Sequence, residues 1–224
     1  MMSRMNCGYI DDTQMHMPYG KLSDGTTLVA AEFQDGVVIG TDSRTSMGSL
    51  IVGRVTDKIT EITPFICCLR SGSAADTQAV TDIVKYMLEV YEMEHNCVAP
   101  VFIAAQMFRD MCYRYREQLS AGILVCGWDQ TKGGQVYSVP LGGMIVRQSM
   151  GCGGSGSTYI YGYLDSTYKA GMTEDECVEF VKKGVALAMS RDGSSGGCIR
   201  LGVISKRGLE RKIFTGDDIP KFTL

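Results

Sequence analysis

A short segment, Gly25-Thr26-Thr27, lies where a polar leader ends and a β-rich stretch begins. A cut after Gly25 would leave Thr26 as a new amino terminus. Such a threonine carries both a nucleophile and its general base. Its hydroxyl can attack, while its own α-amine, with an ordinary pKa of about 8, accepts the proton. Taken alone, the segment is more typical of an ordinary strand start, so the residues downstream must decide between the two interpretations.

Two charged residues downstream could complete this chemistry. An ammonium group near the amine lowers the pKa of the amine and stabilises developing negative charge. Lys58 is the candidate, and Asp42 could hold it in place. The chain has only two histidines, so activation by imidazole, or a metal site, has few residues to draw on. In isolation, Lys58 would be a surface lysine and Asp42 would pair with Arg44 across a turn.

Length and composition limit the kind of protein. With 224 residues, 45% of them apolar, the chain can bury a core in one sizeable domain or two cramped ones. Its formal net charge of −3 argues against a protein whose main work is holding nucleic acid, and no apolar run approaches the roughly 18 residues that span a membrane. The leader lacks the apolar core of a secretory signal, so we expect an intracellular protein. The nine cysteines predict reduced, packed thiols rather than disulfides or zinc ligands.

Hydrophobic periodicity predicts the elements that must position these residues. The expected strands are 27–33, 37–43, 58–63, 65–70, 122–128, 135–139, 144–148, 198–205 and 209–214. The expected helices are 73–94, 100–119, 158–169 and 173–190, with capping boxes at the start of the first and the last. A glycine-rich loop is expected at 151–156. Runs of strands separated by pairs of helices favour antiparallel α+β layers, with two sheets face to face and helix pairs outside them.

Several motifs together resemble a known family. They are Thr26-Thr27, Thr41-Asp42-Ser43-Arg44, Arg54-Val55-Thr56-Asp57-Lys58, the run from Arg70 to Gln78, Met111 to Arg116, Gly153 to Ser157 and Asp192 to Gly197. This set, which covers everything from Gly25 to the C-terminus, is similar to the catalytic β subunits of the eukaryotic 20S proteasome. The resemblance implies an amino-terminal nucleophile hydrolase with a four-layer αββα sandwich. It also implies a leader, residues 1–25, that Thr26 itself removes, and a single catalytic domain, residues 26–224.

The resemblance further implies a role for each matching residue. Thr26 would be the nucleophile of a threonine endopeptidase, with Lys58 and Asp42 in the roles given above. The backbone amide of Gly72 would donate to the oxyanion. The threonine amine and hydroxyl would be supported by Ser155, Asp192 and Ser195. No cofactor, metal or nucleotide is expected.

The resemblance also implies partners and a location. The chain would assemble with other α and β subunits of the 20S core, in two α and two β seven-membered rings, and would act on unfolded polypeptides with regulatory caps at the ends. Neither nucleic acid nor a membrane is an expected partner. The expected location is the cytoplasm and nucleus.

Among the catalytic β types, the sequence most resembles the caspase-like one, which cleaves after acidic residues. Arg70 gives the physical reason, because a guanidinium at the pocket for the residue before the cut can pair with Glu or Asp in a bidentate manner. Thr45, Thr56 and Thr60 match other pocket positions and would keep it polar. By itself, Arg70 would be interpreted as a solvated arginine at a strand end.

Two other functions remain as alternatives. Gly151, Gly153 and Gly156 fit Gly-x-Gly-x-x-Gly, and Glu174 or Glu176 could be the downstream acid of a dinucleotide site, although the neighbouring strands lack βαβ alternation. The other alternative is a ring subunit that assembles but does not cut, which would be expected to lack the threonine, lysine or aspartate. Cys152 stands where a plain apolar residue is expected.

Overall fold

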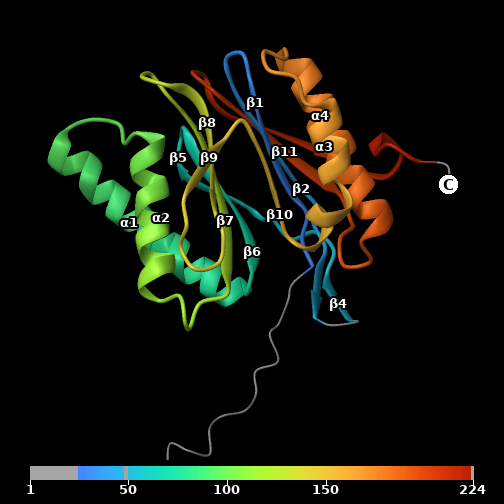
Figure 1. Cartoon of the computed structure of the whole chain (residues 1–224), viewed down its shortest axis with the longest axis horizontal. Helices are drawn as coiled ribbons and strands as arrows, with labels where there is room; N and C mark the ends of the chain where they lie inside the picture. The colour runs from blue at the N-terminus through green and yellow to red at the C-terminus, as the bar shows by residue number, and fades with distance from the viewer. Residues whose placement is uncertain (1–24, 48–49, 223–224) are drawn as a thin grey trace, which may run out of the picture.

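The computed structural model describes residues 25–47 and 50–222, so the predicted leader, residues 1–25, lies outside them except for Gly25. In these ranges, two five-stranded sheets stack face to face, and helices cover the outer side of each (Figure 1). The helices are α1 (Ala74–His95), α2 (Val101–Arg114), α3 (Tyr161–Thr167) and α4 (Glu174–Arg191). One side of the sandwich carries α1 and α2, and the other carries α3 and α4. The predicted α+β class and four-layer αββα arrangement are confirmed.

The first sheet has the strand order β10-β1-β2-β11-β12, and every neighbouring pair is antiparallel. Its strands are β1 (Leu28–Phe33), β2 (Gly36–Thr41), β10 (Met150–Gly153), β11 (Ile199–Ser205) and β12 (Gly208–Phe214). The predicted hairpin of β1 and β2 is present, with Leu28 opposite Thr41. Because side chains alternate along a strand, Val29 packs toward α4 while Leu28 packs toward the second sheet.

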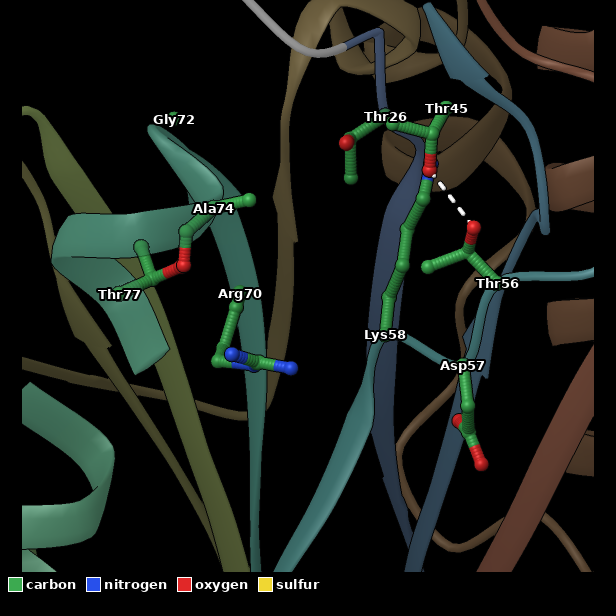
Figure 2. A pocket seen from close by; sticks show the side chains of 9 residues that line it. All are labelled: Thr26, Thr45, Thr56, Asp57, Lys58, Arg70, Gly72, Ala74 and Thr77. Carbon is green, nitrogen blue, oxygen red and sulfur yellow. Dashed lines mark hydrogen bonds between the residues drawn. The ribbon is translucent and has the colours of Figure 1, made fainter. Parts of the chain in front are cut away.

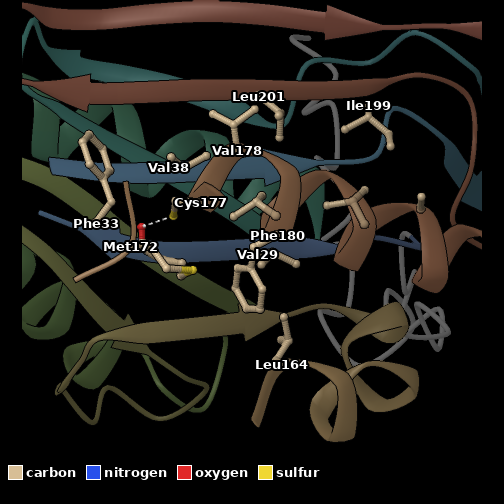
Figure 3. Close-up of a cluster of buried hydrophobic side chains, with 14 of the residues drawn as sticks. Val29, Phe33, Val38, Leu164, Met172, Cys177, Val178, Phe180, Ile199 and Leu201 are labelled. Atoms are coloured by element: carbon tan, nitrogen blue, oxygen red, sulfur yellow. Dashed lines mark hydrogen bonds between the residues drawn. The ribbon is translucent and has the colours of Figure 1, made fainter. Parts of the chain in front are cut away.

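Helix α4 covers the outer face of this sheet. The predicted capping box is present at its start, where the Thr173 hydroxyl accepts from the Glu176 amide and the Glu176 carboxylate accepts from the Thr173 amide. In Figure 3, Phe180 of the helix lies against Val29 of β1, inside a cluster of buried apolar side chains. The helix ends at Arg191, which brings Asp192 to the end of the sheet where β1 begins.

The second sheet has the order β5-β6-β7-β8-β9, also antiparallel throughout. Its strands are β5 (Ile59–Thr63), β6 (Ile66–Gly72), β7 (Ala121–Asp129), β8 (Gly133–Val139) and β9 (Val146–Gln148). Strand β6 leads directly into α1 through Ser73, whose hydroxyl accepts from the Asp76 amide. Apolar side chains of α1 and α2, such as Leu88 and Phe108, fill the space between these helices and the sheet.

The pairing of the strands brings distant residues to one end of the sandwich. The start of β1 lies beside the end of β2, so Thr26 and Asp42 are near each other. In the same way, the start of β5 lies beside the end of β6, which brings Lys58 close to Arg70. The stacking of the two sheets then unites the two pairs.

Some predicted elements differ in the structure. The expected glycine-rich loop begins as strand β10, because its backbone pairs with β1. The expected helix 158–169 is divided into a 3-10 turn, η2 (Ser155–Tyr159), and the short α3. The second helix ends at Arg114 rather than near 119, where turns replace it, and Pro100 is its N-cap rather than its first residue.

Other differences from the predictions concern short elements. Strands β3 (Thr45–Met47) and β4 (Leu50–Gly53) pair with each other and with no other described strand. Strand β9 starts later than expected, after the turn at Gly142 and Gly143. A 3-10 turn, η3 (Gly216–Asp218), follows β12. Among the described helices, none is long and apolar enough to cross a membrane.

Candidate active site

Thr26 lies directly before β1 and is almost fully buried, with 2% of its surface exposed. Its backbone N–H donates to the hydroxyl of Ser155 at 3.2 Å, and its carbonyl accepts from the amide of Gly156 at 3.1 Å. Figure 2 shows its side chain pointing into the space between Lys58 and Gly72. Contacts with the segment that follows β10 therefore fix the position of this residue.

The Lys58 side chain extends from the start of β5 toward Thr26 (Figure 2). Its ammonium donates to Asp42 Oδ1 at 2.7 Å and to the carbonyl oxygen of Gly25 at 2.8 Å. The lysine and the aspartate are both buried. A buried ion pair is tolerated only where further hydrogen bonds satisfy both charges. One lysine thus joins a buried carboxylate to the peptide bond that precedes Thr26.

Backbone amides satisfy the remaining capacity of Asp42. Its Oδ1 also accepts from the amide of Thr27 at 2.9 Å, and its Oδ2 accepts from the amides of Arg44 and Gly196, each at 3.0 Å. The Arg44 guanidinium donates instead to the carbonyl of Gly193. The alternative of an Asp42–Arg44 ion pair is therefore wrong, because the Asp42 carboxylate binds only the backbone of Arg44.

A second carboxylate, Asp192, organises the other side of Thr26. The hydroxyls of Ser155 and Ser195 both donate to its Oδ2, at 2.7 and 2.6 Å. Ser155 is the residue whose oxygen accepts from the Thr26 amide. The Ser195 hydroxyl is 2.8 Å from the hydroxyl of Thr27. The three expected supporting residues are thus adjacent, and they reach both threonines.

Two further residues at this site were not predicted from the sequence. Thr27 is fully buried and joins the two carboxylate groups, since its amide binds Asp42 and its hydroxyl binds Ser195. The Ser46 hydroxyl accepts from the amide of Gly25 at 3.1 Å. For Thr27, the sequence held one indication of a role, its position next to Thr26, but it held none for Ser46.

Two glycines are required by the geometry. A Cβ at Gly25 would lie 2.2 Å from the Cβ of Ser194 and 2.3 Å from its carbonyl oxygen. Gly72 has a φ of +107°, and a Cβ there would lie 2.2 Å from the carbonyl oxygen of Ser120. No other residue fits either position without movement of the backbone. Gly72 lines the same pocket as Thr26.

This pocket opens beside Thr26. It is lined by Thr26, Thr45, Thr56, Asp57, Lys58, Arg70, Gly72, Ala74 and Thr77 (Figure 2). Thr45 and Thr56 both line the pocket, and the hydroxyl of Thr45 donates to that of Thr56 at 2.7 Å. Thr60 does not line this cavity. It lies opposite Cys68 in the β5–β6 ladder.

The Arg70 guanidinium is the prominent charge on the α1 side of the pocket. One of its terminal nitrogens donates to Gln78 Oε1 at 2.7 Å, and the Gln78 amide nitrogen donates to Asp82 Oδ1 at the same distance. Its Nε is buried and has no hydrogen-bond partner among the described residues. A neutral amide therefore orients the guanidinium, and part of its donor capacity is unused.

Buried thiols offer no competing nucleophile near neutral pH. Burial raises the pKa of Cys68 to about 11 and that of Cys177 to about 12, and it also raises the pKa of Cys152. Only the thiolate reacts readily, so these groups are inert. The described cysteines are all free, and all of them except Cys97 are buried or partly buried.

The glycine motif at 151–156 does not form a dinucleotide site. Its first half is strand β10 of an antiparallel sheet, and only a 3-10 turn and the short α3 follow. A dinucleotide fingerprint requires a parallel βαβ unit with a helix N-terminus at the pyrophosphate. Within the described ranges, no cluster of His, Cys, Asp and Glu has the arrangement of a metal site.

Comparison with known proteins agrees with this geometry. The family model described as "Proteasome subunit" matches residues 22–204. This chain belongs to the proteasome subunit family. It is similar to the "Proteasome subunit beta type-6" of Dictyostelium discoideum, with 54% identity over 198 residues, or 88% of this chain and 92% of that protein.

Other relatives of this proteasome subunit have different type numbers. The "Probable proteasome subunit beta type-1" of Schizosaccharomyces pombe is 50% identical over 207 residues, covering 91% of this chain and 92% of that protein. The human "Proteasome subunit beta type-9" is 50% identical over 203 residues, with the same coverage. The chain is therefore a β-type proteasome subunit, and it assembles with other proteasome subunits in the core particle.

Proposed function

We propose that this β subunit is an active threonine endopeptidase that cleaves after acidic residues and matures by cutting its own Gly25–Thr26 bond. The observation that carries the proposal is the contact of the Lys58 ammonium with both Asp42 and the Gly25 carbonyl. A cation at a carbonyl oxygen stabilises the negative charge that develops there when a nucleophile adds to the carbon. Thr26 directly follows Gly25, so its hydroxyl is the nucleophile that would add to the Gly25 carbonyl carbon.

Maturation then follows from this arrangement in two steps. The Thr26 hydroxyl loses its proton to water and bonds to the Gly25 carbonyl carbon, and the C–N bond breaks as the nitrogen takes a proton. This gives an ester between Gly25 and the threonine oxygen. Water hydrolyses the ester, which releases residues 1–25 with a new carboxylate and leaves Thr26 with a free α-amine.

In the mature subunit, the freed amine becomes the base for peptide substrates. Ser155, which already hydrogen-bonds the Thr26 nitrogen and is itself held by Asp192, keeps that amine in position. The threonine oxygen attacks the substrate carbonyl, and the Gly72 amide binds the oxyanion of the tetrahedral intermediate. An acyl-enzyme forms as the first product leaves, and water releases the second product.

The preference for acidic residues rests on Arg70. It lines the pocket next to Thr26, its Nε has no partner among the described residues, and the neutral Gln78 leaves its charge uncompensated. A carboxylate in this pocket would pair with the guanidinium through charge-assisted hydrogen bonds. The hydroxyls of Thr45 and Thr56 make the opposite wall polar.

The wider setting of this activity is also part of the proposal. The subunit would work inside two α and two β seven-membered rings, on unfolded polypeptides, with regulatory caps controlling access. Its location would be the cytoplasm and nucleus.

Replacement of Thr26 by alanine tests the proposal in assembled core particles. We expect Thr26→Ala to abolish both leader removal, measured by the intact mass of the subunit, and hydrolysis of a reporter peptide with Glu before the cut. Thr158→Ala is a matched control, because this hydroxyl is exposed and binds only the carbonyl of Ser155. Normal processing in the Thr26→Ala particles would refute the mechanism. Retention of residues 1–25 in mature wild-type particles would instead favour a subunit that does not cut.

Replacement of Arg70 by alanine tests the specificity. We expect kcat/KM for the Glu reporter to fall by about 10-fold to 100-fold, as for the loss of a charged hydrogen bond worth roughly 1.5–3 kcal/mol. Leader removal should change far less, because the Lys58 contact with Gly25 does not involve Arg70. Equal losses of both activities would indicate a folding defect and contradict the assignment.

A further inference from the structure

An acidic side chain, Asp57, lines the pocket that we assign to acidic substrate residues. This inference rests on the proposed function. A carboxylate in such a wall opposes the binding of another carboxylate, and it can also bind the guanidinium intended for the substrate. The position therefore requires something that keeps Asp57 away from Arg70.

Two contacts hold the Asp57 carboxylate in place, and a third fixes its partner Arg211. Its Oδ2 pairs with the Arg211 guanidinium at 2.5 Å, and its Oδ1 accepts from the amide of Ile59 at 3.0 Å. Arg211 donates a further hydrogen bond to the carbonyl of Ile59 at 3.2 Å. Arg211 belongs to β12 in the first sheet, whereas Asp57 directly precedes Lys58 and β5 of the second sheet. The pair thus joins the two sheets beside the pocket.

The side chains of Arg70 and Asp57 point in different directions. In Figure 2, the Arg70 guanidinium points across the pocket toward the segment that carries Asp57 and Lys58. The Asp57 carboxylate points away from Thr26 and does not turn toward Arg70. Because Asp57 is tethered beside the pocket, its effective concentration at Arg70 would far exceed that of any peptide.

We propose that Arg211 is a positioning residue that keeps Asp57 turned away from Arg70 and neutralises its charge, so that the pocket stays available to acidic side chains of the substrate. Without Arg211, Asp57 keeps only the contact with the Ile59 amide and becomes an internal competitor for Arg70. Arg211 and Asp57 are 40% and 38% exposed, so their interaction is screened by solvent and the effect is moderate.

The test uses assembled core particles and two reporter peptides that differ only in Glu or Gln before the cut, with the rate of Thr26→Ala particles subtracted. We expect Arg211→Gln to raise KM for the Glu reporter about fivefold, which corresponds to about 1 kcal/mol, with kcat unchanged. KM for the Gln reporter should not change. Arg211→Lys keeps the charge and should stay within about twofold of the wild type.

Rescue distinguishes positioning from a general structural effect. Adding Asp57→Asn to Arg211→Gln removes the competitor and should restore KM for the Glu reporter. The matched control is Arg207→Gln on the same β11–β12 hairpin, where the arginine pairs with Glu174 and Glu210, and it should behave as the wild type.

Each contrary outcome identifies which idea fails. An unchanged KM in Arg211→Gln, no rescue by Asp57→Asn, or an equal effect of Arg207→Gln overturns the inference about Arg211. In those cases the loss of Glu cleavage in Arg70→Ala still supports the proposed function. A wild-type particle that does not prefer Glu to Gln overturns both.

Discussion

Replacing Asp42 by asparagine keeps the size of the side chain while removing its charge. The carboxylate accepts four hydrogen bonds, two on each oxygen, from Lys58 and from the amides of Thr27, Arg44 and Gly196. An asparagine has one acceptor oxygen and one NH2 group. In either orientation, two of the four donors would face another donor.

The size of the effect follows from this count. Each buried donor left without an acceptor costs roughly 1–3 kcal/mol, so two such donors cost about 2–6 kcal/mol. Lys58→Met is a useful comparison, because it removes the ammonium and leaves the three backbone donors on Asp42. We expect both variants to lose leader removal and peptide hydrolysis, but only Asp42→Asn to loosen the backbone.

Hydrogen exchange of the assembled particle, followed by mass spectrometry, measures this difference. In Asp42→Asn, exchange at the amides of Thr27, Arg44 and Gly196 should accelerate between about 30-fold and about 10⁴-fold, the range set by 2–6 kcal/mol at 1.4 kcal/mol per factor of ten. In Lys58→Met, the same amides should stay within about tenfold of the wild type. Wild-type exchange in Asp42→Asn would refute the argument that this carboxylate organises the site.

Two further variants test single contacts. Gly25→Ala should slow leader removal, because its Cβ would lie 2.2 Å from the Cβ of Ser194. The rate is measured from the intact mass of the subunit over time. Gly193→Ala, where a Cβ meets nothing within 4 Å, is the control, and equal rates in the two variants would contradict the explanation. Gln78→Glu should reduce kcat/KM for the Glu reporter by about fivefold to 10-fold, because a carboxylate 2.7 Å from Arg70 would compete with the substrate for the guanidinium. An unchanged kcat/KM would show that Arg70 does not bind the substrate.

The layered fold was predictable because its elements have strong local signals. Helix α4 has both a capping box and an apolar stripe, and the β1–β2 hairpin has runs of apolar and β-branched residues on both sides of an Asp-Gly turn. Strand β10 has no such signal, since two of its four residues are glycines. It is a strand only because β1 offers an open edge, and that depends on contacts between residues more than 100 positions apart.

The candidate site shows the same division. Asp42 and Lys58 were predicted because their chemistry is needed by an amino-terminal threonine and their motifs match a family. Ser46, Asp57 and Arg211 were not predicted, because each acts through a partner that only the packing of the two sheets or of a hairpin brings near. A serine or an exposed arginine has no distinctive sequence signal by itself.

The two cationic side chains near Thr26 differ in the partners that they bind. Lys58 and Arg70 line the same pocket, yet Lys58 is paired with a buried carboxylate, while Arg70 is held by the neutral amide of Gln78. Because its charge is already matched, Lys58 can act on a nearby carbonyl without trapping an acidic side chain of the substrate. Arg70 keeps an unmatched charge, which favours a carboxylate ligand. Asp57, which also lines this pocket, is bound by Arg211, so this ion pair determines how much of the Arg70 charge a substrate can use.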